Sequence, residues 1–206
     1  MKELVEHILV DQSQISEVNW GQMAGGVALA GALAMGQPSV ADAGIMVDPG
    51  HGGKDPGAVY QQVEEEDITL AVSKLVASKL GDAKLTREDD SSVGLTTRAK
   101  MANDDASDAF VSIHVNSSEK TPTINGAEVW YYEGSVKGKE MATKVAKAIG
   151  AKRGIKPGKF AVLRKTNMPA ILIELGFINH PEDRKKLIDP VWQENIATSI
   201  VNALKQ

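Results

Sequence analysis

Residues 45–53 read IMVDPGHGG, an apolar run that ends in Asp-Pro and then places one histidine between glycines. The three apolar residues that open the stretch are typical of a short buried strand, and Pro49 cannot donate to a ladder, so we expect the strand to end there. The flanking glycines leave room for another group to approach the imidazole of His51. The stretch therefore predicts a strand that presents a ligand-binding histidine. A histidine that only caps a turn is the alternative.

The composition is that of an ordinary globular chain with one main core, since 42% of its 206 residues are hydrophobic and 24% are charged. Cysteine is absent, so any metal must bind histidine and carboxylate. The formal net charge of -4 argues against a dedicated nucleic-acid binder. Residues 137–165 nevertheless carry ten Lys or Arg against one acid. A solvated surface is the favoured interpretation of that segment, and attraction to an anionic polymer is the alternative.

Residues 1–43 differ in character from the remainder of the chain. No charged residue occurs from 18 to 41, and residues 23–35 are only Ala, Gly, Val, Leu and Met. This apolar run is too short to span about 30 Å of hydrocarbon. A cleaved export signal, a membrane-associating or helix-pairing tether and a flexible leader all remain open, although acidic residues stand where an export signal carries positive charge. We expect the folded domain to occupy residues 44–206 and to be monomeric.

Apolar spacing and turn residues divide residues 44–206 into alternating strands and helices. This alternation predicts a single layered α/β domain with a mixed, mostly parallel sheet flanked by helices. Strands are expected at 45–47, 83–86, 109–115, 126–132 and 170–175, helices at 64–80, 95–103, 135–149, 181–187 and 191–204, and an ordered loop at 152–165.

Further polar residues coincide with these predicted strands. His114 ends the strand 109–115 with Asn116 just beyond, and Glu174 lies inside the apolar run AILIEL. A carboxylate in such a strand is costly unless it is paired, protonated or bound to a partner, so Glu174 is a functional candidate; a buried ion pair with an arginine is the alternative. Ligands gather at strand ends in such sheets. Two histidines and one carboxylate are sufficient for a catalytic zinc with one open position.

A set of motifs in a fixed order gives a more specific indication. The motifs are IMVDPGHGG at 45–53, EEDITL at 65–70, LTREDD at 85–90, TTRAKMAN at 96–103, DAFVSIHVN at 108–116, GAEVWYY at 126–132 and FAVLRKTNMPAILIELGFINHPED at 160–183. With these motifs the chain resembles the zinc-dependent N-acetylmuramoyl-L-alanine amidases of the amidase-3 type, enzymes that cut peptidoglycan. The resemblance covers residues 44–204.

The resemblance implies one Zn²⁺ with ligands at His51, Glu65 and His114. Glu65 is chosen among three adjacent acids because the family pattern is Glu-x-Asp or Asn followed by an apolar residue. A shift of one position in that register would select Glu64 or Glu66 instead.

The same resemblance implies that Glu174 is catalytic, accepting a proton from a zinc-activated water and passing it to the departing amine of L-alanine. Asn116 is expected to orient substrate or a ligand, and Arg164 to bind a peptide carboxylate; structural hydrogen bonding is the alternative for both. The implied partner is peptidoglycan at the bacterial cell wall, for a bacterial autolysin or a phage lysis enzyme alike. A zinc hydrolase of another amide and a peptidoglycan-binding module without turnover are the alternative functions.

Overall fold

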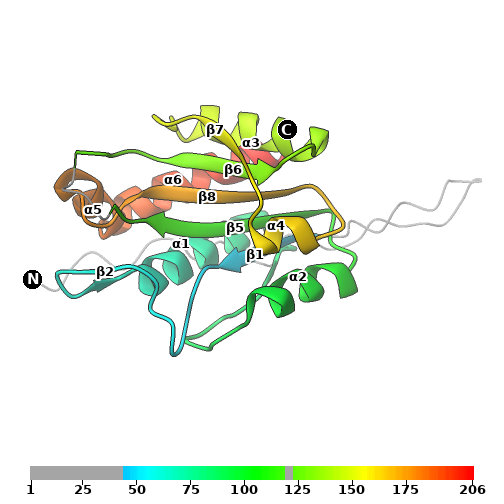
Figure 1. Ribbon diagram of the computed structural model, residues 1–206, viewed down its shortest axis with the longest axis horizontal. Helices are drawn as coiled ribbons and strands as arrows, with labels where there is room; N and C mark the ends of the chain where they lie inside the picture. The colour runs from blue at the N-terminus through cyan, green and yellow to red at the C-terminus, as the bar shows by residue number, and fades with distance from the viewer. Residues whose placement is uncertain (1–43, 119–122) are drawn as a thin grey trace, which may run out of the picture. The chain divides into compact units, whose positions relative to one another are not determined.

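The computed structural model describes residues 44–118 and 123–206 (Figure 1). The predictions for residues 1–43 lie outside the described residues. The strands are β1 (Ile45–Pro49), β2 (Val59–Tyr60), β3 (Val63–Glu64), β4 (Lys84–Leu85), β5 (Ala109–Asn116), β6 (Glu128–Tyr132), β7 (Ile155–Gly158) and β8 (Ala170–Phe177). The helices are α1 (Glu65–Leu80), α2 (Leu95–Asp104), α3 (Val136–Ala148), α4 (Ala161–Lys165), α5 (Pro181–Leu187) and α6 (Pro190–Leu204).

Six strands form one mixed sheet in the order β4-β1-β5-β8-β6-β7. The neighbours β4, β1, β5 and β8 are parallel, β6 is antiparallel to β8, and β7 is parallel to β6. Strands β2 and β3 form a separate two-stranded hairpin. The predicted mixed and mostly parallel α/β sheet is therefore confirmed, and the carboxyl ends of β1, β5 and β8 meet at one edge.

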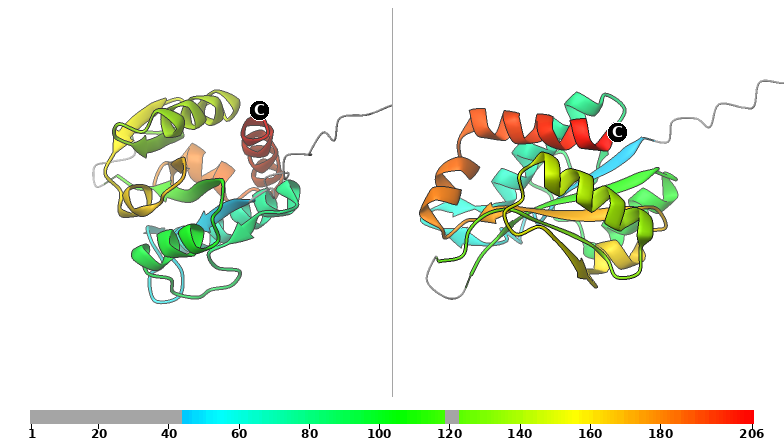
Figure 2. Two further views of the ribbon diagram at one scale, coloured as in Figure 1. Left: turned by 90° about the vertical axis from the view of Figure 1, so that its right-hand side faces the viewer. Right: turned by 90° about the horizontal axis from the view of Figure 1, so that it is seen from above.

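The helices cover the two faces of the sheet unequally. The left view of Figure 2 shows α1, α6 and α3 on one side, with α2 and α4 on the other. The larger core joins the first three helices to one face of the sheet, and its members include Val72, Val145, Ile200, Val111 and Ile173. The smaller core joins α2 and α4 to the opposite face, and its members include Ala102, Val162, Phe110 and Leu172.

Strand alternation decides which face carries the predicted site. Successive side chains of a strand point to opposite faces. His114 is four residues after Phe110, and Glu174 is two residues after Leu172, so both share the face of the smaller core. The site residues of β5 and β8 therefore lie on the side of the sheet that α2 and α4 cover.

The helix predicted at 64–80 is confirmed as α1. Its first turn contains Glu65, Glu66 and Asp67, and Gly81 caps its end with a φ of 92° and a hydrogen bond to the carbonyl of Ala77. Acids near a helix N-terminus are favoured by the macrodipole, so all three are compatible with this position. Only Glu65 and Glu66 among these acids are buried.

The prediction of a loop at 152–165 is wrong, because this segment contains β7 and α4. Pro157 and Gly158 concealed the strand, since both residues are rare inside a sheet. Strand β7 tolerates them because it is an edge strand that pairs only with β6. Helix α4 is a single short segment stabilised by burial of Val162 and Leu163, and it is too short to show a helical period in the sequence.

Among residues 44–118 and 123–206, no helix combines the length and the apolar character that crossing a membrane requires.

Candidate metal centre

The loop after β1 brings the two predicted histidines together. The backbone N–H of Gly50 donates to the carbonyl of Ile113 at 2.9 Å, which extends the pairing of β1 with β5 beyond Pro49. A Cβ at Gly50 would lie 2.4 Å from the ring of His114, so only glycine fits there. His51 itself has a φ of 60°, in the left-handed region that side chains with a Cβ rarely adopt. The rings of His51 and His114 consequently lie 4.9 Å apart at 81°.

Two buried arginines hold the backbone of this loop. Arg98 donates to the carbonyls of Pro49 and His51, and its guanidinium forms an ion pair of 2.7 Å with the buried Asp48. Arg87 donates to the carbonyl of Gly50 at 2.9 Å. The position of His51 is therefore fixed by the fold, through donors that come from α2 and from the segment after β4.

Glu65 is the point on which both rings converge. Its Oε1 lies 3.2 Å from Nε2 of His51 and 2.9 Å from Nδ1 of His114. The N–H groups of Val115 and Ala58 donate to Oε1 and Oε2, each at 2.9 Å. Burial raises the pKa of Glu65, but hydrogen bonds and charge from His114 and His51 outweigh it and lower the pKa to about 2. The carboxylate is thus ionised, buried and fixed in orientation.

Asp55 holds the other side of the His51 ring, and the sequence analysis did not identify it. Oδ2 of Asp55 lies 2.9 Å from Nδ1 of His51. Burial lowers the pKa of His51, but the hydrogen bonds and charges of Glu65 and Asp55 outweigh it and raise the pKa to about 9. The signal available in the sequence was an acid four residues after the histidine in a glycine-rich loop.

Among the described residues, no contact joins Glu64 or Glu66 to the two histidines. Glu64 ends β3 and directly precedes α1. Glu66 is buried, and its pKa is raised by burial and by the adjacent carboxylate of Asp90. Of the three acids that the sequence left open, Glu65 is the one whose side chain contacts the two histidines.

Glu174 lies beside this cluster. It is the Cα partner of His114 in the pairing of β5 with β8. The strand β5 ends at Asn116, one residue beyond the predicted range of 109–115, and a bulge between His114 and Asn116 interrupts its ladder with β8. Oε2 of Glu174 is buried and has no hydrogen-bond partner among the described residues. Burial is the main reason that the pKa of Glu174 is raised, to about 7, and the charges of Glu65 and Glu128 add to it against His114 and His51.

On its other side Glu174 pairs in register with Glu128 of β6, a second carboxylate that the sequence analysis missed. Glu128 is buried and pairs with Arg153 and Lys156. Asn116, a predicted substrate contact, donates to Glu128 at 3.2 Å. The signal for Glu128 was present, because GAEVWYY places one acid in an otherwise apolar strand as AILIEL does for Glu174.

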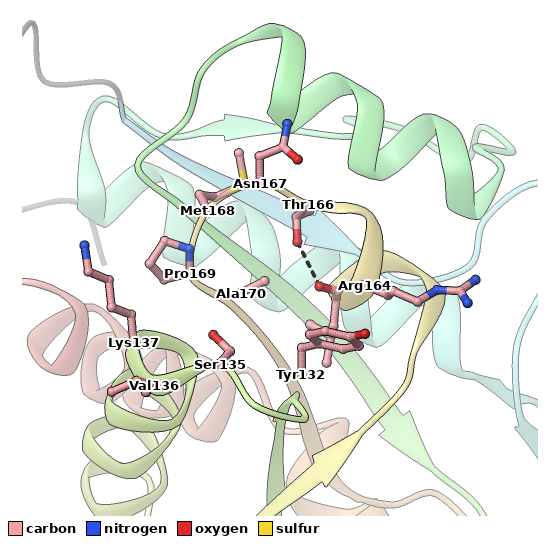
Figure 3. Close-up of a pocket in the computed structure, with 11 residues that line it drawn as sticks. Tyr132, Ser135, Val136, Lys137, Arg164, Thr166, Asn167, Met168, Pro169 and Ala170 are labelled. Atoms are coloured by element: carbon pink, nitrogen blue, oxygen red, sulfur yellow. Dashed lines mark hydrogen bonds between the residues drawn. The ribbon is translucent and has the colours of Figure 1, made fainter.

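Arg164, the second predicted substrate contact, is exposed on α4 beside a cavity of about 450 Å³ (Figure 3). The cavity lies at the amino end of β8, and the guanidinium in Figure 3 extends away from Ser135 and Lys137 on its far side. No hydrogen bond or ion pair within the described part of the chain joins the side chain of Arg164 to the histidine cluster. Asn116 thus contacts Glu128, the strand partner of Glu174, whereas the substrate contact of Arg164 stays a prediction.

The donor atoms fit a zinc ion. His51, Glu65 and His114 each offer one atom, and these atoms lie within 4.8 Å of one another. Zinc bound at about 2.0–2.2 Å to nitrogen and oxygen in a tetrahedron separates its ligand atoms by about 3.3 Å. The distances of 3.2 and 2.9 Å from the rings to Glu65 are close to that separation. Two imidazoles and one carboxylate also leave a fourth position for water, as in catalytic zinc sites.

Comparisons with known proteins identify relatives of this chain. A family model described as N-acetylmuramoyl-L-alanine amidase matches residues 45–206. The protein YqiI of Bacillus subtilis is 36% identical over 172 residues, covering 78% of this chain and 82% of YqiI. The probable cell wall amidase LytH of Staphylococcus saprophyticus is 33% identical over 174 residues, and the match covers 80% of this chain but 58% of LytH.

Among solved structures, the crystal structure of an N-acetylmuramoyl-L-alanine amidase from Clostridium difficile 630 superposes with a TM-score of 0.76 at 37% sequence identity. The match covers 78% of this chain and 94% of that one.

Proposed function

Since the chain belongs to the N-acetylmuramoyl-L-alanine amidase family of the amidase-3 type, we propose that it hydrolyses the amide bond between N-acetylmuramic acid and the L-alanine of the peptidoglycan stem peptide with one Zn²⁺. The observation that carries the proposal is the convergence of His51 and His114 on the buried Oε1 of Glu65, directly beside Glu174. The protein would act at the bacterial cell wall, as the name of its relative LytH indicates for that protein.

The metal would be held by Nε2 of His51, Nδ1 of His114 and a carboxylate oxygen of Glu65. When bound, zinc supplies a water acidified toward a pKa of about 7 and a Lewis acid for the scissile carbonyl. Asp55 accepts a hydrogen bond from Nδ1–H of His51 and keeps Nε2 turned toward Glu65. The backbone N–H groups of Val115 and Ala58 keep Glu65 from rotating away.

Glu174 is proposed as the general base and acid. Burial raises the pKa of Glu174, to about 7 in the metal-free chain, and a carboxylate with a raised pKa is suited to take a proton from the attacking water and to return it to the departing amine. The unpartnered Oε2 supports this role, since a buried carboxylate oxygen without a hydrogen bond is costly unless a reacting group uses it.

The remaining assignments are proposals that fewer contacts in the structure support. Asn116 would orient substrate or a neighbouring side chain from the bulge of β5, and Arg164 would contact substrate from α4. Residues 44–206 would form the catalytic domain and work as a monomer. Size-exclusion chromatography of the purified chain with light-scattering detection would give its molar mass and so test whether it is a monomer.

The experiment that tests the function is digestion of purified peptidoglycan by the zinc-loaded protein, with and without a chelator. Mass spectrometry of the products should show intact stem peptides with new L-alanine amino termini, lost with chelator and restored by added zinc. Products cut elsewhere in the peptide would favour a zinc hydrolase of another amide. Retention on insoluble peptidoglycan without any cleavage, by folded and zinc-loaded protein, would favour a binding module.

A further inference from the structure

Glu128 places two cations next to Glu174. It is the Cα partner of Glu174 in adjacent strands, and only 2% of its surface is exposed. Nε of Arg153 and Nζ of Lys156 both lie 2.6 Å from Oε2 of Glu128. Burial raises the pKa of Glu128, but the hydrogen bonds and charges of Lys156 and Arg153 lower it further than burial raises it. One buried carboxylate therefore holds two cations at the edge of the site.

The charges in this cluster do not cancel. Two cations against one carboxylate leave one positive charge. The other oxygen of Glu128 already accepts from Asn116 at 3.2 Å and from Trp130 at 3.1 Å, so no acceptor of Glu128 is left for the remaining donors. Of the three nitrogens in the Arg153 guanidinium, only Nε has a hydrogen-bond partner among the described residues.

Both cations are accessible and held in position. About 30% of the Arg153 side chain and 31% of the Lys156 side chain are exposed. The guanidinium of Arg153 lies 5.4 Å from the ring of Phe177, and Nζ of Lys156 lies 5.2 Å from the ring of Trp130. Aromatic faces attract such cations and restrict their movement. The donors that remain free are thus presented to solvent at a defined place.

We propose that Arg153 and Lys156, anchored on Glu128, form a subsite that binds a carboxylate of the substrate's stem peptide beside Glu174. The inference rests on the proposed amidase function. In that substrate the lactyl carboxyl group is consumed in the scissile amide, so the carboxylates left to recognise belong to the peptide. Charge-assisted hydrogen bonds from arginine and lysine are the strong, directional contacts that suit such a group.

The first test changes the substrate and leaves the protein intact. Soluble muramoyl-peptide fragments are prepared with free carboxylates and, in a second batch, with these converted to primary amides. The zinc-loaded wild-type protein should cleave the amidated batch with a kcat/KM about ten- to a hundredfold lower, chiefly through a higher KM. Equal kcat/KM for both batches would overturn the subsite and leave the amidase function standing. Failure to cleave either batch would instead remove the proposed function.

The second test locates the carboxylate. Arg153→Met and Lys156→Met should each lower kcat/KM for the free-carboxylate batch and leave it nearly unchanged for the amidated batch. Lys144→Met, on the exposed face of α3, is the matched control and should keep the full preference. Zinc content and circular dichroism establish that each variant is folded. If both variants keep the wild-type preference, the carboxylate binds elsewhere and the proposal is wrong; Arg164→Met would then be the next variant.

Discussion

Oδ2 of Asp55 lies 2.9 Å from Nδ1 of His51, on the side of the ring opposite the nitrogen that faces Glu65. A carboxylate in this position fixes the tautomer and the orientation of a metal-binding histidine.

Asp55→Ala should therefore weaken zinc binding by about 10- to 100-fold, with activity restored at high zinc concentration. Competition with a chromogenic chelator measures the affinity. Glu88→Ala, an exposed acid in the segment after β4, is the control and should bind zinc as the wild type does. An unchanged affinity in Asp55→Ala would show that the hydrogen bond seen here has no bearing on the metal.

Substitutions of a proposed ligand and of the proposed base should have different effects on zinc content. His114→Ala should lose zinc and activity together, because it removes one of the converging donor atoms. Glu174→Gln should keep about one zinc per chain while turnover falls by about 10²- to 10⁴-fold or more. Elemental analysis and product release are measured on the same samples. Zinc loss in Glu174→Gln would mean that Glu174 is a ligand and that the roles given to it and Glu65 must be exchanged.

Zinc binding should release a proton from the protein. The pKa of His51 in the metal-free chain is raised to about 9, so its imidazole is protonated at pH 7, whereas a metal ligand must be neutral. Zinc affinity should consequently increase as the pH rises from 7 to 9. Titration calorimetry in buffers of different ionisation enthalpy measures the proton count directly. An observed enthalpy that is independent of the buffer would contradict this expectation.

The metal-free protein should lose stability as the pH rises through neutrality because of Glu174. Its folded pKa, about 7, exceeds the ordinary value of 4.5, so the folded state binds the proton more tightly than the unfolded state does. This contribution is complete below pH 4.5 and is lost as the pH passes 7. Urea unfolding of chelator-treated protein at several pH values measures it. Glu174→Gln should flatten the curve between pH 4.5 and 7, and Glu140→Gln on α3 should not.

Arg98→Met should destabilise the fold by about 3–5 kcal/mol, because it leaves the buried Asp48 without its ionic partner. Thermal or urea unfolding measures the loss. Lys100→Met, whose pairing with Asp104 is exposed, should change stability by less than about 1 kcal/mol. A small effect of Arg98→Met would show that the hydroxyl groups of Thr86 and Ser112, which also donate to Asp48, suffice to hold it.

The strand and helix order was predictable because most elements bury a face whose apolar period is visible in the sequence. The long strands β5 and β8 and the helices α1 and α6 were found for that reason. Strand β7 was not, since its stability comes from pairing with β6, and pairing partners distant in sequence leave no local signal.

The candidate site was predictable to a different extent for each kind of residue. His51, His114 and Glu174 stand out as polar groups in apolar surroundings, and motif resemblance selected Glu65 among its neighbours. Asp55 was missed because a short side chain in a glycine-rich loop has no periodicity. Glu128 was missed although it satisfies the criterion that identified Glu174, because nothing local reveals that β6 lies next to β8.

Hydrogen bonds from Arg98 and Arg87 hold the loop that carries His51. They end on the backbone carbonyls of Pro49, Gly50 and His51, and none of them requires a metal. In zinc fingers metal binding is what stabilises the folded chain, so removing the metal unfolds it. Here the loop is held by arginines that are themselves buried in the fold. The protein should therefore remain folded but inactive when zinc is scarce and regain its activity on resupply without refolding. Under the proposed zinc dependence, the local zinc supply would act as a reversible control over hydrolysis of the wall.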